Sequence, residues 1–178
     1  MRDRDLIQSF APGAEPDGEA TDARPLEGRR RLARVAAIQV LYQSAMTRAQ
    51  IPAVAKQFED HRLGENIDGL ALDVDVAFFR RLTSGIAKDA AALTLLVQEA
   101  LQKRQFGRLE YVLQAILIAG AYELQALRDV PPRSTIDEYT DIAAAFFDKG
   151  ERSLVNAVLD RLAHGMRPDD FSATPAAS

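Results

Sequence analysis

The stretch over residues 109–127, LEYVLQAILIAGAYELQAL, constrains the fold more than any other part of this chain. Between Tyr111 and Tyr122, apolar residues occur on nearly every side of a helix with 3.6 residues per turn. A helix that is apolar all round is buried by neighbouring helices or by lipid. Because the run is far shorter than the roughly 20 residues that span a bilayer, we expect a central core helix in a globular protein.

The segments on either side also have helical spacing, and no segment alternates as strands do. Further helices are expected at residues 29–47 and 52–62, from Asp73, over 93–101, from Thr135 to Phe147, and from about residue 150 to Gly165. Asp73 and Asp75 suit a helix N-terminus. Thr135 with Glu138 matches a capping box, and Gly165 suits a helix C-terminus. The predicted fold class is all-α with about seven helices.

The two ends of the chain differ from the middle in composition. Residues 1–28 contain prolines, glycines and seven acidic residues but few large apolar ones, so they cannot bury enough surface to offset their ordering entropy. We predict a disordered acidic extension over residues 1–28, one all-α domain over 29–166, and a flexible tail rich in Ala, Ser and Pro over 167–178.

The basic residues are concentrated near the start of the predicted domain. The net charge of −4 arises within residues 1–28, and the remainder carries 19 basic and 19 acidic residues. Residues 29–50 hold five arginines and no acid. These arginines therefore repel one another unless an external anion is present. The pattern is compatible with a solvated helix face and with a nucleic-acid-binding face.

A helical wheel of residues 29–47 divides this segment into two sides. Leu32 and Val35 lie on the apolar side, while Arg30, Arg34 and Leu41 share an arc near the opposite side. We expect the first side to face a core. The arginine side should then present cations, with Leu41 as an apolar contact for a base or a partner.

The residues needed for catalysis are scarce. The chain has no cysteine and only two histidines, His61 and His164, which lack the spacing of metal ligands. No glycine-rich phosphate loop occurs. The start of the chain lacks the pattern of a signal peptide. We expect a cytoplasmic protein with no cofactor, no metal, no membrane partner and no enzymatic activity.

Five segments of the chain form a recognisable series. They are RRRLARVAAIQVLYQ from Arg29, DVDVAFFRRLTSGIA from Asp73, LQAILIAGAYEL from Leu113, DVPPRSTIDEYTDIAAAFF from Asp129 and SLVNAVLDRLA from Ser153. In this order, over most of residues 29–168, they resemble the NusB family of bacterial transcription antitermination factors. The resemblance implies a fold of two small packed helical bundles and a non-enzymatic RNA-binding protein.

The resemblance also implies partners. It indicates binding to single-stranded boxA-type RNA of ribosomal RNA leaders, jointly with NusE, a ribosomal small-subunit protein. The pair would join other Nus factors on the RNA polymerase elongation complex. Whether the free protein forms a homodimer is left open.

Site residues follow from the family's motifs, position by position. The implied RNA-binding residues are Arg29, Arg30, Arg31, Arg34, Lys149, Arg152, Ser153 and Leu154. The implied NusE-binding residues are Tyr42, for which a core position is the alternative, and Glu110. A Lys-Phe pair frequent in the family is replaced here by Ser153 and Leu154, which removes a cation and a stacking ring. Asn156 is interpreted as a buried hydrogen-bonding residue.

Two other interpretations stay open at this point. One is a protein-only all-α adaptor whose arginines serve solubility. The other is a stand-alone relative of the N-terminal domain of ribosomal RNA methyltransferases, which would need a separate catalytic chain.

Overall fold

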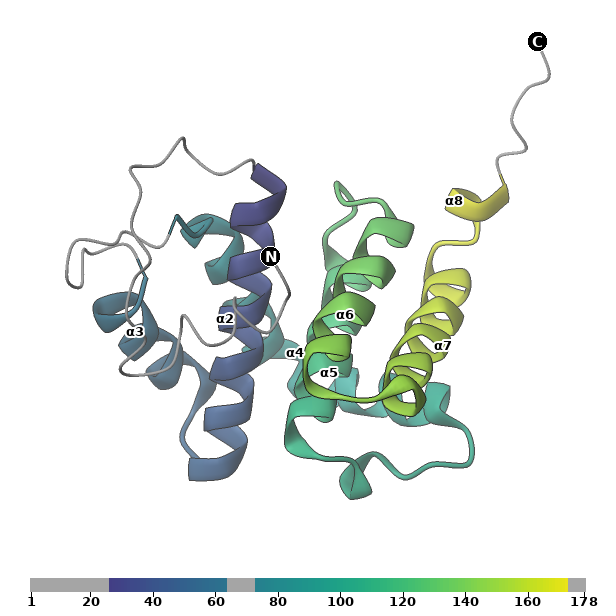
Figure 1. The fold of residues 1–178 in the computed structure, drawn as a ribbon, viewed down its shortest axis with the longest axis horizontal. Coiled ribbons are helices and arrows are strands. Elements are labelled where there is room, and N and C mark those ends of the chain that lie inside the picture. Colours follow the sequence, from purple (N-terminus) through teal and green to yellow (C-terminus); the bar gives the residue numbers. More distant parts are fainter. Residues whose placement is uncertain (1–25, 64–72, 173–178) are drawn as a thin grey trace, which may run out of the picture. The chain divides into compact units, whose positions relative to one another are not determined.

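The computed structural model describes residues 26–63 and 73–172, and most of them are helical (Figure 1). Within these ranges no strand occurs, and the helical elements are α2 (Leu26–Thr47), α3 (Ile51–His61), α4 (Val76–Leu101), the 3₁₀ turn η1 (Phe106–Arg108), α5 (Tyr111–Ala126), α6 (Pro132–Phe146), α7 (Lys149–Met166) and α8 (Asp169–Ser172). The predicted all-α class is confirmed. The chain divides into two compact units, residues 1–89 and 90–178, with the boundary inside α4.

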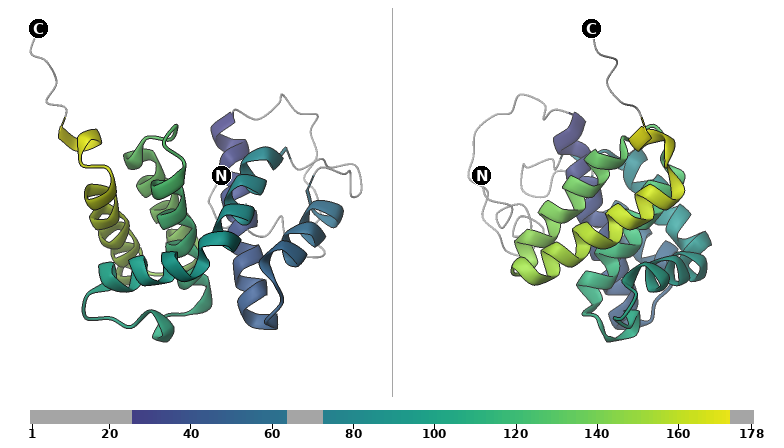
Figure 2. Two further views of the ribbon diagram at one scale, coloured as in Figure 1. Left: turned by 180° about the vertical axis from the view of Figure 1, so that it is seen from behind. Right: turned by 90° about the vertical axis from the view of Figure 1, so that its right-hand side faces the viewer.

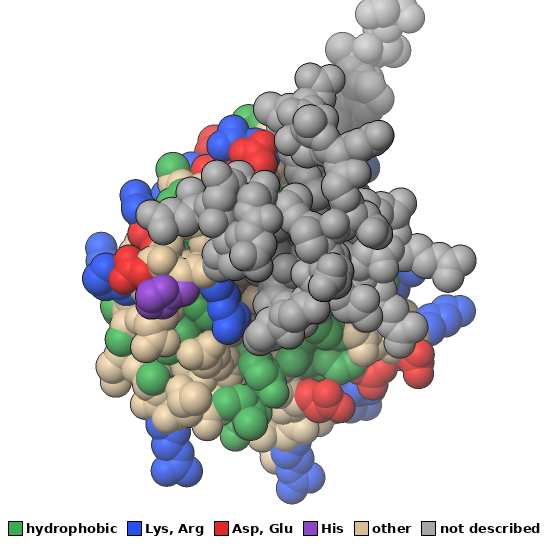
Figure 3. Space-filling model, turned by 60° about the vertical axis from the view of Figure 1, so that its left-hand side comes forward, with side chains coloured by type: hydrophobic (Ala, Val, Ile, Leu, Met, Phe, Trp, Pro, Cys, Tyr) green, Lys and Arg blue, Asp and Glu red, His purple; other side chains and the backbone are tan. Residues whose placement is uncertain are grey.

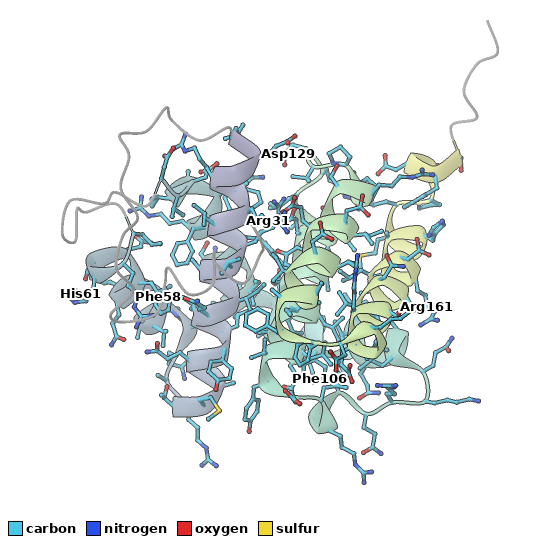
Figure 4. The ribbon with its side chains drawn as sticks, viewed as in Figure 1. Arg31, Phe58, His61, Phe106, Asp129 and Arg161 are labelled. Carbon is cyan, nitrogen blue, oxygen red and sulfur yellow. The ribbon has the colours of Figure 1, made fainter. Side chains whose placement is uncertain are left out.

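The first unit contains α2, α3 and the first half of α4. α2 begins at Leu26, three residues before its predicted start, so its first turn overlaps the predicted acidic extension. α3 packs against α2, with the buried ring of Phe58 between them (Figure 4). Glu59 of α3 accepts two hydrogen bonds from Arg80 of α4, at 2.9 and 2.7 Å, and these bonds raise the pKa of the Arg80 guanidinium.

α4 is one continuous helix where the sequence predicted two (Figure 2). Residues 87–92, which directly precede the second of the two predicted helices, read AKDAAA and contain four alanines and no proline. Alanine is the strongest helix former, so nothing interrupts the helix there. The predicted acidic N-terminus is confirmed, because Asp75 Oδ1 accepts a hydrogen bond from the Phe78 backbone N–H at 2.9 Å.

The second unit is built from α5, α6 and α7, which contact one another pairwise (Figure 2). The prediction of a core helix is confirmed, since residues 115–124 of α5 are buried throughout. Gly120 allows α7 to approach closely, because a Cβ there would lie 2.8 Å from both methyl carbons of Leu159. Arg161 of α7 donates a hydrogen bond to the carbonyl of Ala100 at the end of α4 (Figure 4).

The predicted capping box at Thr135 and Glu138 is wrong. α6 begins one turn earlier, at Pro132, where a first-turn proline loses no intrahelical hydrogen bond. Thr135 therefore lies inside the helix and donates its hydroxyl to the buried carboxylate of Glu123, at 3.2 Å. Tyr139 donates to the same carboxylate at 2.9 Å. The Thr135 hydroxyl therefore does not cap the helix but donates a hydrogen bond to the buried carboxylate of Glu123.

Structure continues past the predicted domain boundary at residue 166. α7 ends at Met166, one residue beyond the glycine expected to end it. Arg167 is buried and donates to the Val130 carbonyl at 2.8 Å. The ring of His164 stacks on Phe171 of α8, with centroids 3.9 Å apart. Residues 1–25 and 173–178, which make up most of the two predicted tails, lie outside the described residues.

A helix that crosses a bilayer must be long and apolar. None of the helices in residues 26–63 and 73–172 is both long enough and apolar enough to cross a bilayer.

Candidate nucleic-acid interface

Three consecutive arginines occupy the first turns of α2. Arg29, Arg30 and Arg31 are all partly exposed, and the side chains of Arg29 and Arg30 are 39% and 27% exposed. Figure 4 shows Arg31 on this helix. The N-terminus of a helix carries a partial positive charge that favours anions. The first turn of α2 carries the acidic Glu27, and the three arginines follow as the fourth to sixth residues of the helix.

Carboxylates from the segment before α4 meet two of these arginines. Arg29 Nε lies 2.7 Å from Asp73 Oδ1, and Arg30 Nε lies 3.7 Å from Asp75 Oδ2. The Asp75 backbone N–H also donates to the Arg29 carbonyl at 3.2 Å. We expected the arginines to repel one another unless an external anion is present, and this expectation is wrong for Arg29 and Arg30, because acids of the protein itself face them. The wheel considered one helix alone, whereas the compensating acids are more than 40 residues away in sequence.

An aromatic ring of α4 lies beneath two of the α2 arginines. The guanidinium carbons of Arg30 and Arg34 each lie 5.0 Å from the centroid of Phe78, within the range of a cation–π contact. Phe78 is 2% exposed and Arg34 is 4% exposed. Arg30 remains partly accessible at the surface. One ring therefore supports an exposed cation and a buried one.

The predicted surface positions of Arg34 and Leu41 on α2 are wrong. Arg34 is buried, and so is Leu41, which was expected to offer an apolar contact on the surface. Residues 32–38 are buried on all sides of the helix. The difference between surface and core in α2 thus runs along the helix axis, and a wheel, which averages over the length of a helix, cannot detect it.

The second predicted RNA-binding region lies at the start of α7, in the other unit. Lys149, Arg152 and Ser153 are exposed, and Leu154 is partly buried. Arg152 Nη2 lies 3.7 Å from Asp141 Oδ1 of α6, and both side chains are about half exposed. The structure therefore places a cation at the surface here as well.

The predicted partner-binding residues are at the surface. Tyr42 of α2 is 39% exposed, which excludes the alternative of a core position. Glu110 is exposed and precedes α5, and its side chain does not cap that helix. Asn156 is also exposed, so its interpretation as a buried hydrogen-bonding residue is wrong.

The surface carries no sign of a metal centre in the described ranges. No group of three or more His, Asp or Glu side chains among residues 26–63 and 73–172 could hold an ion. Figure 3 shows one face of the molecule, where Lys and Arg side chains are interspersed with acidic and uncharged ones. Mixed charges on a surface weaken its long-range attraction for a polyanion. Binding of a polyanion here would therefore depend mainly on direct contacts with individual arginines.

The sequence pattern of the NusB family matches residues 31–164, which is most of the chain. The match includes Arg31 and the start of α7, and Arg29 and Arg30 directly precede it. The chain belongs to the NusB family. It is 45% identical over 145 residues to the transcription antitermination protein NusB of Bradyrhizobium diazoefficiens, covering 80% of this chain and 88% of that protein. The Brucella ovis protein of the same name is 40% identical over 163 residues, covering 90% and 95%.

A solved structure agrees with this assignment. T. maritima NusB matches with a TM-score of 0.68 at 25% identity, over 85% of this chain and 100% of that one. The NusB family consists of transcription antitermination factors and not of enzymes, so the predictions of family, antitermination role and absence of catalysis are confirmed.

Sequence reasoning missed two residues that shape the interface of this NusB-family chain. No functional role was predicted for Phe78, and Asp75 was assigned only to a helix start. Their contacts with Arg30 depend on the packing of α4 against α2, which no local pattern encodes. One sequence feature could have pointed to this pair. Asp75 and Phe78 are three residues apart, which puts a capping acid and an aromatic ring one helical turn apart.

Proposed function

We propose that this chain binds single-stranded boxA-type RNA of ribosomal RNA leaders, in the cytoplasm, through the first turns of α2. The observation that carries the proposal is the cluster of partly exposed arginines, Arg29, Arg30 and Arg31, at a helix N-terminus in a member of an antitermination family. Guanidinium groups bind phosphates through two parallel hydrogen bonds. Three of them in succession suit the backbone of an RNA strand.

In this proposal RNA phosphates take over positions now held by carboxylates. Asp73 and Asp75 meet Arg29 and Arg30 through the Nε side of each guanidinium. A guanidinium has five N–H donors, so a phosphate competes with the acid for the same group. Phosphate contacts set the affinity and the register of the strand, whereas base identity is read by stacking and by contacts with base edges.

The start of α7 is proposed as a second RNA contact. Lys149 and Arg152 supply exposed cations, and Ser153 and Leu154 follow on the same helix. The region has neither the Lys nor the Phe frequent in the family at the last two positions. We therefore expect a smaller contribution from this region than from α2.

The proposed protein partner is NusE, with Tyr42 and Glu110 as contact residues. Tyr42 exposes its ring beside Met46, which is 53% exposed on the next turn of α2. Exposed aromatic and Met side chains are typical of protein interfaces. With NusE the chain would act on RNA polymerase together with other Nus factors.

The test is a gel shift with a boxA-like RNA oligonucleotide, performed with the full chain alone and with NusE. The proposal predicts weak binding by the chain alone and a tighter shift with NusE. A NusE complex without any RNA shift would favour the protein-only adaptor and contradict the proposal. Binding to neither would point to a different partner, such as a methyltransferase chain, which co-purification can identify. Size-exclusion chromatography of the free chain tests for a homodimer.

A further inference from the structure

Phe78 connects the exposed part of α2 to its buried part. Its ring is buried at the start of α4, yet Arg30 and Arg34 of α2 both place their guanidinium carbons 5.0 Å from its centroid. The two arginines are four residues apart and therefore share one side of the helix. Arg34 is buried and Arg30 is partly exposed. The ring thus lies at the boundary between core and surface.

Asp75 fixes the ring relative to α2. Its Oδ1 accepts the backbone N–H of Phe78 at 2.9 Å, and its own backbone N–H donates to the Arg29 carbonyl at 3.2 Å. Its Oδ2 lies 3.7 Å from Arg30 Nε. One residue therefore caps α4, ties α4 to α2 and faces the guanidinium that lies over the ring.

We propose that Phe78 is a positioning residue for RNA binding, which acts by holding the Arg30 guanidinium at the surface of α2. The inference rests on the proposed function. An arginine side chain loses much rotamer freedom when it is fixed on a ligand. A guanidinium already held over an aromatic ring loses less of this freedom on binding a phosphate.

Arg34 has a different role in this arrangement. Because its guanidinium is buried, it supports the ring from the core side and acts on RNA only through Phe78. The arginines of α2 thus divide into contact residues at the first turns and one internal support.

The experiment compares Phe78→Leu with Phe79→Leu in the full chain, using a boxA-like single-stranded RNA oligonucleotide as probe. Phe79 is the adjacent residue of α4 and is also fully buried, whereas the ring that lies under Arg30 and Arg34 is that of Phe78. Both variants remove the same atoms from the core. Phe78→Leu should weaken RNA binding by about twofold to fivefold, the range for one lost cation–π contact at an exposed site. Phe79→Leu should change it by less than twofold.

A double-mutant cycle with Arg30→Ala separates positioning from general loss of structure. If Phe78 acts through Arg30, then Phe78→Leu has little further effect on RNA affinity once Arg30 is alanine. Thermal unfolding of every variant measures the structural effect independently. Should Phe78→Leu fail to fold, Phe78→Met replaces it, because Met fills irregular core space.

Equal RNA affinities of Phe78→Leu and Phe79→Leu would overturn the inference, and so would additive effects of Phe78→Leu and Arg30→Ala. If the wild-type chain with NusE does not bind the RNA at all, the proposed function fails instead. The two failures are therefore distinguishable.

Discussion

The starts of α2 and α7 both carry cations at the surface, but the two are built differently. At α2, Arg29 and Arg30 lie against carboxylates, and Arg30 also lies over a buried ring. At α7, Arg152 is half exposed, with one carboxylate at 3.7 Å. A side chain held in place loses less entropy on binding a ligand. We therefore expect a cation at the start of α2 to bind an anion more tightly than a cation at the start of α7.

The largest expected difference between the two regions concerns stability. Arg34→Ala removes a buried side chain and its contact with Phe78, and should lower the free energy of unfolding by about 2 kcal/mol. Arg152→Ala removes an exposed side chain and should change it by less than about 0.5 kcal/mol. Urea denaturation followed by circular dichroism measures both. An equal loss of unfolding free energy in the two variants would contradict the difference between the two regions.

Adding a cation and an aromatic ring at the start of α7 should strengthen RNA binding by that region. The double variant Ser153→Lys with Leu154→Phe restores a cation and a ring, and should raise affinity for boxA-like RNA by about tenfold, the lower range for one stacked base. Ser153→Gln with Leu154→Met is the matched control, with similar size but no charge or ring. Fluorescence anisotropy of labelled RNA measures both. The prediction fails if the control gains as much affinity.

The smallest expected effect tests the carboxylates that face the α2 arginines. Asp73→Asn removes the acid that lies 2.7 Å from Arg29 and so removes a competitor of RNA phosphate. RNA affinity should rise about twofold, as for the loss of one exposed ion pair. Asp60→Asn on α3, whose carboxylate pairs with Lys56 at 2.8 Å, controls for net charge. A similar gain in both variants would indicate a general charge effect.

Much of the fold was predictable from local sequence. The apolar residues of α5 predicted a core helix, because such a segment has no polar side to expose. The acids before α4 predicted its start. The capping box at Thr135 failed, because Pro131 and Pro132 allow the helix to begin earlier and Glu123 uses the hydroxyl. A pattern of neighbouring residues could not show that Thr135 has a hydrogen-bond partner, Glu123, on another helix.

The candidate interface was less predictable than the fold. The sequence identified the arginines but assigned Arg34 to the surface and gave Arg29 and Arg30 no acidic partners. Both errors have one cause, since α4 packs against the start of α2 through contacts distant in sequence. Tyr42 was named as a partner-binding residue only through the family resemblance, because its place on the wheel also suited a core. The structure shows that its ring is exposed.

The central claim is that the first turns of α2 bind RNA phosphates. Its most direct test is the salt dependence of boxA-like RNA binding by the chain with NusE, for wild type and for Arg29→Ala with Arg30→Ala. The account predicts that the slope of log K against log salt falls in magnitude by about 1.4, or about 0.7 for each lost phosphate contact. Arg48→Ala with Lys56→Ala, which removes two exposed cations of the same unit, should leave the slope unchanged. An equal slope in wild type and the Arg29 and Arg30 double variant would contradict the account.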